Sequence, residues 1–289
     1  MKKVISLILC VLMLGSCMAF ADAIEGSRTV IGADLDADDI AYVYKEFGIS
    51  RGDVKELTVT NAEEREYLNG VVDESLIGTK SISCVYIEAL DEGKGLDVQV
   101  KNITWCTPDM YMNAMVTAGI TDANVRIVAP FDVSGTAALT GIYKAYEDIT
   151  GKKLDEDAKL VGTQELTVTA ELAEEIGSTD SAAIVNQLKL ILDETKDMTD
   201  DELREEIKEI AEEYDVTLTD SQIDSLISLC RSMEKLDAAA LKEKVEQVQK
   251  YLKDIVSKQG EIKQFLSSVA DTVTEFVNKV VSFIRGIFG

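Results

Sequence analysis

The first half of the chain shows short apolar and alternating runs separated by stretches with helical spacing, a pattern that predicts an α/β fold. The expected strands lie at 29–32, 54–60, 81–90, 96–105 and 125–129. The expected helices lie at 37–47, 61–69, 108–118 and 134–150. This order, β-α-β-α-β-β-α-β-α, predicts a mixed sheet with helices packed on it. The segment Asp91–Gly95 is expected to be the turn of a hairpin between the third and fourth strands.

Capping residues mark the ends of several predicted helices. Thr107 followed by Pro108 predicts a helix start, and Asp36 predicts another. Asn61 with Glu64, and likewise Thr199 with Glu202 and Thr219 with Gln222, have the spacing of capping boxes. The acidic run 34–39 does not fit a calcium loop, because the sixth and twelfth positions lack the required glycine and glutamate.

The second half of the chain is predicted to be all-α. Helices are expected at 170–176, 181–196, 200–214 and 220–236. From Leu241 to Ile287 apolar residues follow one heptad series, broken at Gln259, which is typical of a coiled-coil seam or the inner face of a helix bundle. The predicted organisation is a signal peptide at 1–21, an α/β domain at 28–151, a connector at 152–178, a helical region at 179–260 and an amphipathic helix at 261–289.

The final 29 residues are electrically neutral, unlike the acidic chain before them. The apolar residues expected to make the contacts of this helix, called the C-terminal seam below, are Phe265, Val269, Val273, Phe276, Val280, Phe283 and Ile287, all but Phe265 on the heptad series. Three interpretations stand side by side: a helix of an intramolecular bundle, a self-association helix, and a helix that lies on a membrane or the cell envelope.

The N-terminus has the pattern of a secretory signal. Lys2 and Lys3 precede an apolar run, and Ala19-Phe20-Ala21 fits a cleavage site, so we expect an exported protein. The alternative is a lipid anchor at Cys17, because residues 14–17 resemble a lipobox. Removing residues 1–21 takes away two lysines and no acid, which leaves 27 Lys and Arg against 53 Asp and Glu, a formal net charge of −26. Such a surface repels nucleic acid.

The composition removes several classes of enzyme chemistry. The chain has no histidine, which excludes His-dependent triads and His-containing zinc sites. Cys84, Cys106 and Cys230 remain after cleavage, share no metal-ligand spacing, and are expected to be buried free thiols. Residues 78–81 and 232–235 resemble parts of a P-loop and of a Ser-Lys dyad, but both lack the rest of their motifs. We therefore assign no catalytic residue, metal or cofactor.

Two candidate sites remain. Ser134, Gly135 and Thr136 follow a strand and open a helix, with Thr140 one turn further, so they form a candidate anion site. The alternative is that these residues only cap the helix. Trp105 and Tyr111 form a candidate aromatic surface, with core packing as the alternative.

The chain carries several long motifs: NITWxTPxMYxNA at 102–114, TAGITDA at 117–123 and APFDVSGTAALTGI at 129–142, with IGADL at 31–35 and IGTKSIS at 77–83. These motifs resemble those of the YpuA-like exported proteins of Gram-positive bacteria, catalogued as domain of unknown function 1002. The resemblance implies export and a cell-envelope setting, and it supplies no catalytic residues. Together these observations predict a non-enzymatic binding or scaffold module that uses its C-terminal helices for self-association or envelope contact, with a small-anion-binding protein or enzyme as the alternative.

Overall fold

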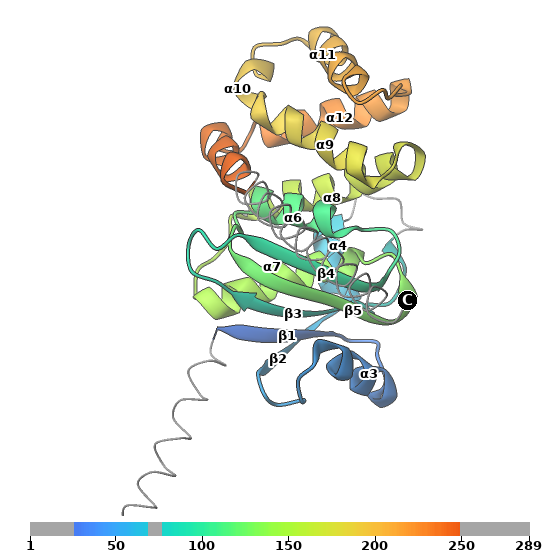
Figure 1. Ribbon diagram of the computed structural model, residues 1–289, viewed down its shortest axis with the longest axis vertical. Helices are drawn as coiled ribbons and strands as arrows, with labels where there is room; N and C mark the ends of the chain where they lie inside the picture. The colour runs from blue at the N-terminus through green and yellow to red at the C-terminus, as the bar shows by residue number, and fades with distance from the viewer. Residues whose placement is uncertain (1–25, 69–76, 249–289) are drawn as a thin grey trace, which may run out of the picture. The chain divides into compact units, whose positions relative to one another are not determined.

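The computed structural model describes residues 26–68 and 77–248 of the 289-residue chain. Residues up to Val245 group into one compact unit, and residues from Glu246 onward belong to a second one. Figure 1 shows the first unit as a sheet with helices around it and further helices stacked beyond. The expected α/β class of the N-terminal part, with a mixed sheet, is confirmed.

The sheet has five strands in the order β2-β1-β3-β5-β4. Their bounds are β1 Ser27–Gly32, β2 Lys55–Val59, β3 Cys84–Ala89, β4 Leu96–Ile103 and β5 Ala123–Val133. β1 pairs with β2 in parallel and β4 with β5 in parallel, whereas β3 is antiparallel to both β1 and β5. Four strands therefore run the same way, and β3 runs against them.

The expected hairpin between the third and fourth strands is wrong. β5 lies between β3 and β4, with Cys84 opposite Val128 and Val98 opposite Val125. The reason is burial: β5 carries Val125, Ile127 and neighbouring apolar residues that are buried, which suits an interior position. β4 exposes every second residue at its centre and takes the edge. Residues 91–95 therefore connect two strands that do not pair.

Helices surround this sheet and continue beyond it. Their bounds are α3 Ala37–Phe47, α4 Asn61–Leu68, α6 Pro108–Thr117, α7 Thr136–Thr150, α8 Glu156–Ile176, α9 Ser178–Leu190, α10 Leu192–Thr195, α11 Asp200–Glu212 and α12 Asp220–Met233. The capping boxes at Thr199 and Thr219 are confirmed, as is the Asp36 N-cap, whose carboxylate accepts from two backbone N–H groups.

Three other predictions about helices need correction. The helix expected at 170–176 begins at Glu156, because Asp155 caps it by accepting from the Ala158 N–H. The helix expected at 181–196 is divided at Ile191 into α9 and α10. The capping box expected from Asn61 and Glu64 lies one residue earlier: the Thr60 N–H donates to Glu63, and the Glu63 N–H donates to the Thr60 hydroxyl.

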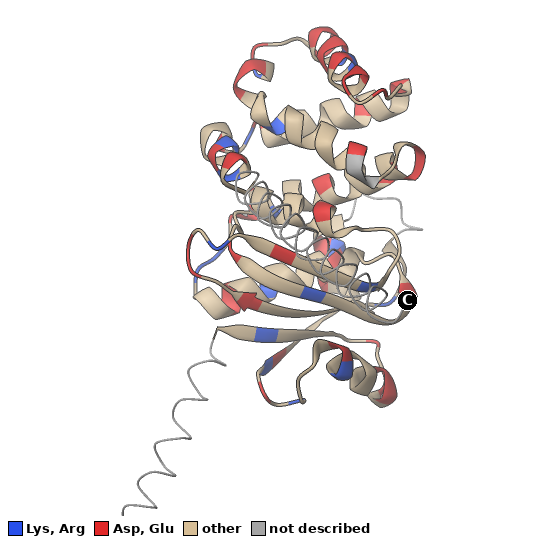
Figure 2. Ribbon diagram, viewed as in Figure 1, with Lys and Arg blue, Asp and Glu red and all other residues tan. Residues whose placement is uncertain are grey.

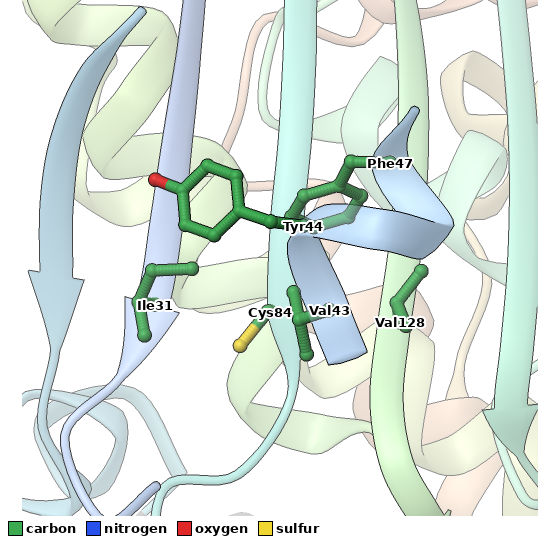
Figure 3. Packing of buried hydrophobic residues seen from close by; sticks show 6 residues of the cluster. All are labelled: Ile31, Val43, Tyr44, Phe47, Cys84 and Val128. Carbon is green, nitrogen blue, oxygen red and sulfur yellow. The ribbon is translucent and has the colours of Figure 1, made fainter. Parts of the chain in front are cut away.

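Different helices cover the two faces of the sheet. α7 packs on β1 and β3, and Gly141 lets it approach because a Cβ there would touch Val30 and Val85. α3 packs on the opposite face through Val43, Tyr44 and Phe47, which meet side chains of β1, β3 and β5 (Figure 3). The sheet therefore lies between two apolar layers, one formed with α7 and the other with α3.

α8 packs against both α6 and α9, so the helices after Gly151 contact the α/β layer directly. The domain boundaries given above remain predictions. The C-terminal seam from Phe265 to Ile287 lies outside the described residues, and the heptad pattern there stays a prediction. Among the residues that the structure describes, no helix has both the length and the apolar composition to cross a membrane.

Candidate functional site

The carboxyl ends of four strands meet at one edge of the sheet. Because β1, β2, β4 and β5 run in the same direction, their connections to α3, α4, α6 and α7 all leave from this edge. The segment that enters β3 reaches the same edge from the opposite direction. Open α/β sheets bind ligands beyond the carboxyl ends of their strands, so this edge is the first place to examine.

A pocket of about 320 Å³ opens at this edge. Its lining comes from α4, from the segment before β3, and from the junction of β5 and α7. The polar side chains in the lining belong to Glu64, Thr79, Lys80, Ser83, Ser134 and Thr136. We call this cavity the edge pocket. Its size lies at the small end of the range for ligand sites.

The backbone at the start of α7 is fixed by Tyr111. Gly135 has φ +101°, and a Cβ at this position would overlap the Tyr111 hydroxyl and Ile103. The Tyr111 Oη donates to the Gly135 carbonyl oxygen at 2.6 Å. Since a left-handed conformation without space for a side chain requires glycine, this residue sets the direction in which α7 leaves β5.

Glu64 is a buried ionisable group in the pocket wall. Its side chain is 1 % exposed, and its Oε1 accepts from the Thr136 hydroxyl at 2.6 Å. The Asn61 amide donates to Oε2 at 3.3 Å. Burial raises the pKa of this carboxyl, and the hydrogen bonds from Thr136 and Asn61 offset part of that rise.

The structure brings three of the four predicted anion-site residues together. Ser134, Gly135 and Thr136 line the edge pocket, whereas Thr140 is buried further along α7 and is not part of the lining. The Thr136 hydroxyl is already bonded to Glu64. An ionised carboxylate at that distance would disfavour a bound anion, so the charge of Glu64 decides what the pocket can hold.

Trp105 and Tyr111 do not form a joint surface. Tyr111 is fully buried, so for this residue core packing is the correct interpretation. Trp105 is half-buried, and its indole N–H donates to Glu174 of α8 at 2.7 Å. The tryptophan therefore links the β4–α6 junction to α8.

Among the described residues, Cys84, Cys106 and Cys230 are free and buried, as the sequence predicts. Burial raises the pKa of Cys84 and of Cys106 to about 12, and that of Cys230 to about 11. Thiols with such values are poor nucleophiles near neutral pH. Within the described part of the chain, no group of three or more acidic or cysteine side chains is arranged to hold a metal ion.

Sequence reasoning did not place Glu64 or the segment 77–83 at this site. The spacing of Asn61 and Glu64 predicts only a local capping role for Glu64, and residues 78–81, which include Lys80, lack the rest of a P-loop motif. One signal in the sequence points to the role of Glu64. Thr60 and Glu63 also have capping-box spacing and form the cap, so Glu64 is not needed as a capping residue.

Comparison with known proteins decides the family. The family described as "Protein of unknown function (DUF1002)" matches residues 31–251. The chain belongs to this family. It is also 37 % identical over 275 residues to a Bacillus subtilis (strain 168) protein named "Uncharacterized protein YpuA", and the match covers 93 % of each chain. No solved structure matches. The edge pocket lies within the matched residues.

Proposed function

We propose that this DUF1002 protein is an exported, non-enzymatic binding or scaffold module of the cell envelope. The supporting observation concerns the described thiols and one hydroxyl of the edge pocket: Cys84, Cys106 and Cys230 are buried with raised pKa values, and the hydroxyl of Thr136 is bonded to Glu64. The leader pattern at residues 1–21 supports export, with a lipid anchor at Cys17 as the alternative.

The contact surface in this proposal is the C-terminal seam. Residues 261–289 are neutral overall and carry apolar residues at heptad spacing, whereas α11 is densely acidic (Figure 2). A neutral apolar helix on an acidic protein can meet a second copy or an envelope surface without the charge repulsion of the rest of the chain. The proposed partners are therefore a second copy or the envelope, and not nucleic acid.

The test uses the mature chain, residues 22–289, and a variant with Val273→Asp and Phe276→Asp on the seam. A control with Thr274→Asp and Asn278→Asp adds the same charge beside the seam. Light scattering measures self-association, and flotation with liposomes measures membrane contact. We expect the parent and the control to self-associate or float, and the seam variant to do neither. A parent that stays monomeric and never floats would contradict the proposal.

A second candidate function is binding of a small anion, or catalysis on one, at the helix start around Ser134–Thr136. The observation that favours it is the edge pocket, which combines three predicted residues with Lys80 at the carboxyl edge of the sheet. A thermal-shift screen of the mature chain with phosphates, sugars and peptides tests it. A stabilising compound that Ser134→Ala weakens supports this function, and a broad screen without any shift counts against it.

A further inference from the structure

The outer edge of β4 is an unpaired strand edge. β4 is the last strand of the sheet and pairs with β5 alone among the described strands. The Ala123 N–H of β5 donates to the Gly95 carbonyl, which fixes the side of β4 that each residue's backbone groups face. Because these groups alternate along a strand, those of Leu96, Val98 and Val100 point away from β5. This edge therefore offers N–H and C=O groups to a further strand.

The opposite edge of the sheet, on β2, is occupied. The Val59 carbonyl accepts from the Ala33 N–H on the inner side of β2, so the neighbouring Thr58 carbonyl points outward. This outward oxygen accepts from the Lys144 ammonium at 2.6 Å, and Lys144 is held there by an ion pair with Glu63. Within residues 26–68 and 77–248, no comparable bond reaches the outward groups of β4.

The exposed side chains of β4 carry a symmetric charge pattern. Asp97, Gln99 and Lys101 are exposed and lie on one face of the strand. The Gln99 amide donates to the Asp97 carboxylate at 3.0 Å. The Lys101 ammonium donates to Glu46 of α3 at 2.5 Å, which holds it on the same face of the sheet as α3. One negative and one positive charge therefore stand two residues to either side of Gln99.

We propose that β4 pairs antiparallel with β4 of a second copy of this chain, across a two-fold axis at Gln99. In this register Asp97 of each copy lies opposite Lys101 of the other, and the two Gln99 side chains meet at the axis. Val98 of each copy lies opposite Val100 of the other, and these two residues form the backbone hydrogen bonds because their groups point outward.

The charges select this register among those that the backbone allows. Moving the axis to Val98 or to Val100 also brings outward backbone groups together, but it takes Asp97 away from Lys101. Charged side chains on an edge strand usually oppose pairing with other strands. On β4 the two charges have opposite signs and symmetric positions, so they favour pairing with the same strand of another copy in one register.

The paired segment is short, so it needs another contact to bring two copies together. Residues 97–101 of each strand form the ladder, because Asn102 has φ +57° and the regular register with β5 is interrupted there. Stable interfaces bury about 1,200 Å² or more, which one short strand pair does not reach. The inference therefore rests on the self-association proposed above: the C-terminal seam brings copies together, and β4 pairs at the resulting high local concentration.

The experiment is disulfide trapping in the mature chain, residues 22–289, under mild oxidation. Gln99→Cys places two thiols at the two-fold axis, where opposed residues of a non-hydrogen-bonded pair have Cα atoms about 4.5 Å apart, within reach of a disulfide. Asp97→Cys is the matched control, because its two copies lie about 14 Å apart along the paired strands. The native thiols at Cys84, Cys106 and Cys230 are buried and stay in place.

We expect Gln99→Cys to form a linked dimer at least about tenfold faster than Asp97→Cys, because only the first pair of thiols is held within bonding distance. Reaction of each variant with a small thiol reagent corrects for differences in reactivity. Circular dichroism confirms that both variants fold. Equal corrected rates would mean that the links form by random collision, and this result overturns the pairing of β4.

A charge variant tests the register. In the Gln99→Cys chain, Asp97→Lys places two ammonium groups opposite each other, and the trapping rate should fall to that of Asp97→Cys. Glu92→Lys makes the same charge change at an exposed position before β4 and should leave the rate unchanged. If Asp97→Lys and Glu92→Lys trap equally fast, the register centred on Gln99 is wrong.

The seam variant separates this inference from the proposed function. Val273→Asp with Phe276→Asp in the Gln99→Cys chain should slow trapping, because copies no longer meet through the seam. Trapping at the parent rate would keep the β4 contact and overturn the role of the seam. A parent that self-associates or floats, with equal rates for Gln99→Cys and Asp97→Cys, overturns the β4 contact and leaves the proposed function standing. A parent that stays monomeric, never floats and is not trapped overturns both.

Discussion

Lys189 of α9 and Glu165 of α8 form an ion pair at 2.5 Å in which both side chains are fully buried. The Thr117 hydroxyl donates to the second oxygen of Glu165 at 2.5 Å, and the Lys189 ammonium donates to the Asn113 carbonyl at 3.0 Å. Burial lowers the pKa of Lys189, although the nearby Glu165 carboxylate opposes that change. The pair joins α6, α8 and α9, where the α/β layer meets the later helices.

Removing one member of this pair should be far more harmful than removing both. Lys189→Met leaves Glu165 buried without its cation, and we expect a loss of about 3–5 kcal/mol in the free energy of unfolding. In the double variant Lys189→Met, Glu165→Met, the unpaired charge is gone and most of the loss should be recovered. Urea unfolding followed by circular dichroism measures each value.

The control for this comparison is Lys208→Met. Lys208 and Glu205 form an exposed pair within α11, and such pairs contribute about 0–1 kcal/mol. If Lys189→Met lowered the free energy of unfolding as little as Lys208→Met does, the buried ion pair would not stabilise the contact between α6, α8 and α9.

Gly135 should be the least tolerant of the described helix-flanking glycines. Gly135→Ala places a methyl group against the Tyr111 hydroxyl and Ile103 in a left-handed conformation, and we expect a loss of about 2–4 kcal/mol. Gly151→Ala is the matched control: φ is +65° there, but no atom lies within 4 Å of the new methyl. It should cost about 1 kcal/mol. Thermal unfolding of both variants compares them, and equal losses would mean that the contact with Tyr111 is unimportant.

The thiols should be unreactive in the folded protein. Because burial raises the pKa of Cys84 and Cys106 to about 12 and that of Cys230 to about 11, hardly any thiolate forms near neutral pH. The mature chain should react with a thiol reagent only slowly at about pH 8, and at all three sites after denaturation. Rapid labelling of one native cysteine, located by mass spectrometry, would show that this thiol is accessible.

Local sequence signals predicted the parts of the fold that depend on local chemistry. Asp36 and Thr199 cap helices through bonds to residues two or three positions away, and such short-range contacts leave a readable spacing. Pairing between strands depends on distant partners. The insertion of β5 between β3 and β4 reflects which strand can be buried on both faces, and turn residues at 91–95 carry no information about that.

α8 was difficult to predict because buried helices need not be apolar. Thr163, Thr167 and Thr169 have low helix propensity, yet their hydroxyls donate to carbonyls one turn earlier and are satisfied inside the protein. Only part of the candidate site could be predicted from local sequence. Gly135 after a strand indicates where α7 begins, but the contact between Glu64 and Thr136 joins residues 72 positions apart and leaves no local pattern.

The central claim about the site is that burial beside Thr136 raises the pKa of the Glu64 carboxyl, and a titration of this side chain measures that directly. Carbon-13 NMR of the mature chain, with Glu64→Gln to assign the signal, gives the pKa. We predict a value above the ordinary 4.5 for glutamate, because burial penalises the charged form. A folded-state pKa above the unfolded one means that this group's contribution to stability falls as the pH rises through that interval. A value at or below 4.5 would contradict the account, since burial would then not disfavour the charged form of Glu64.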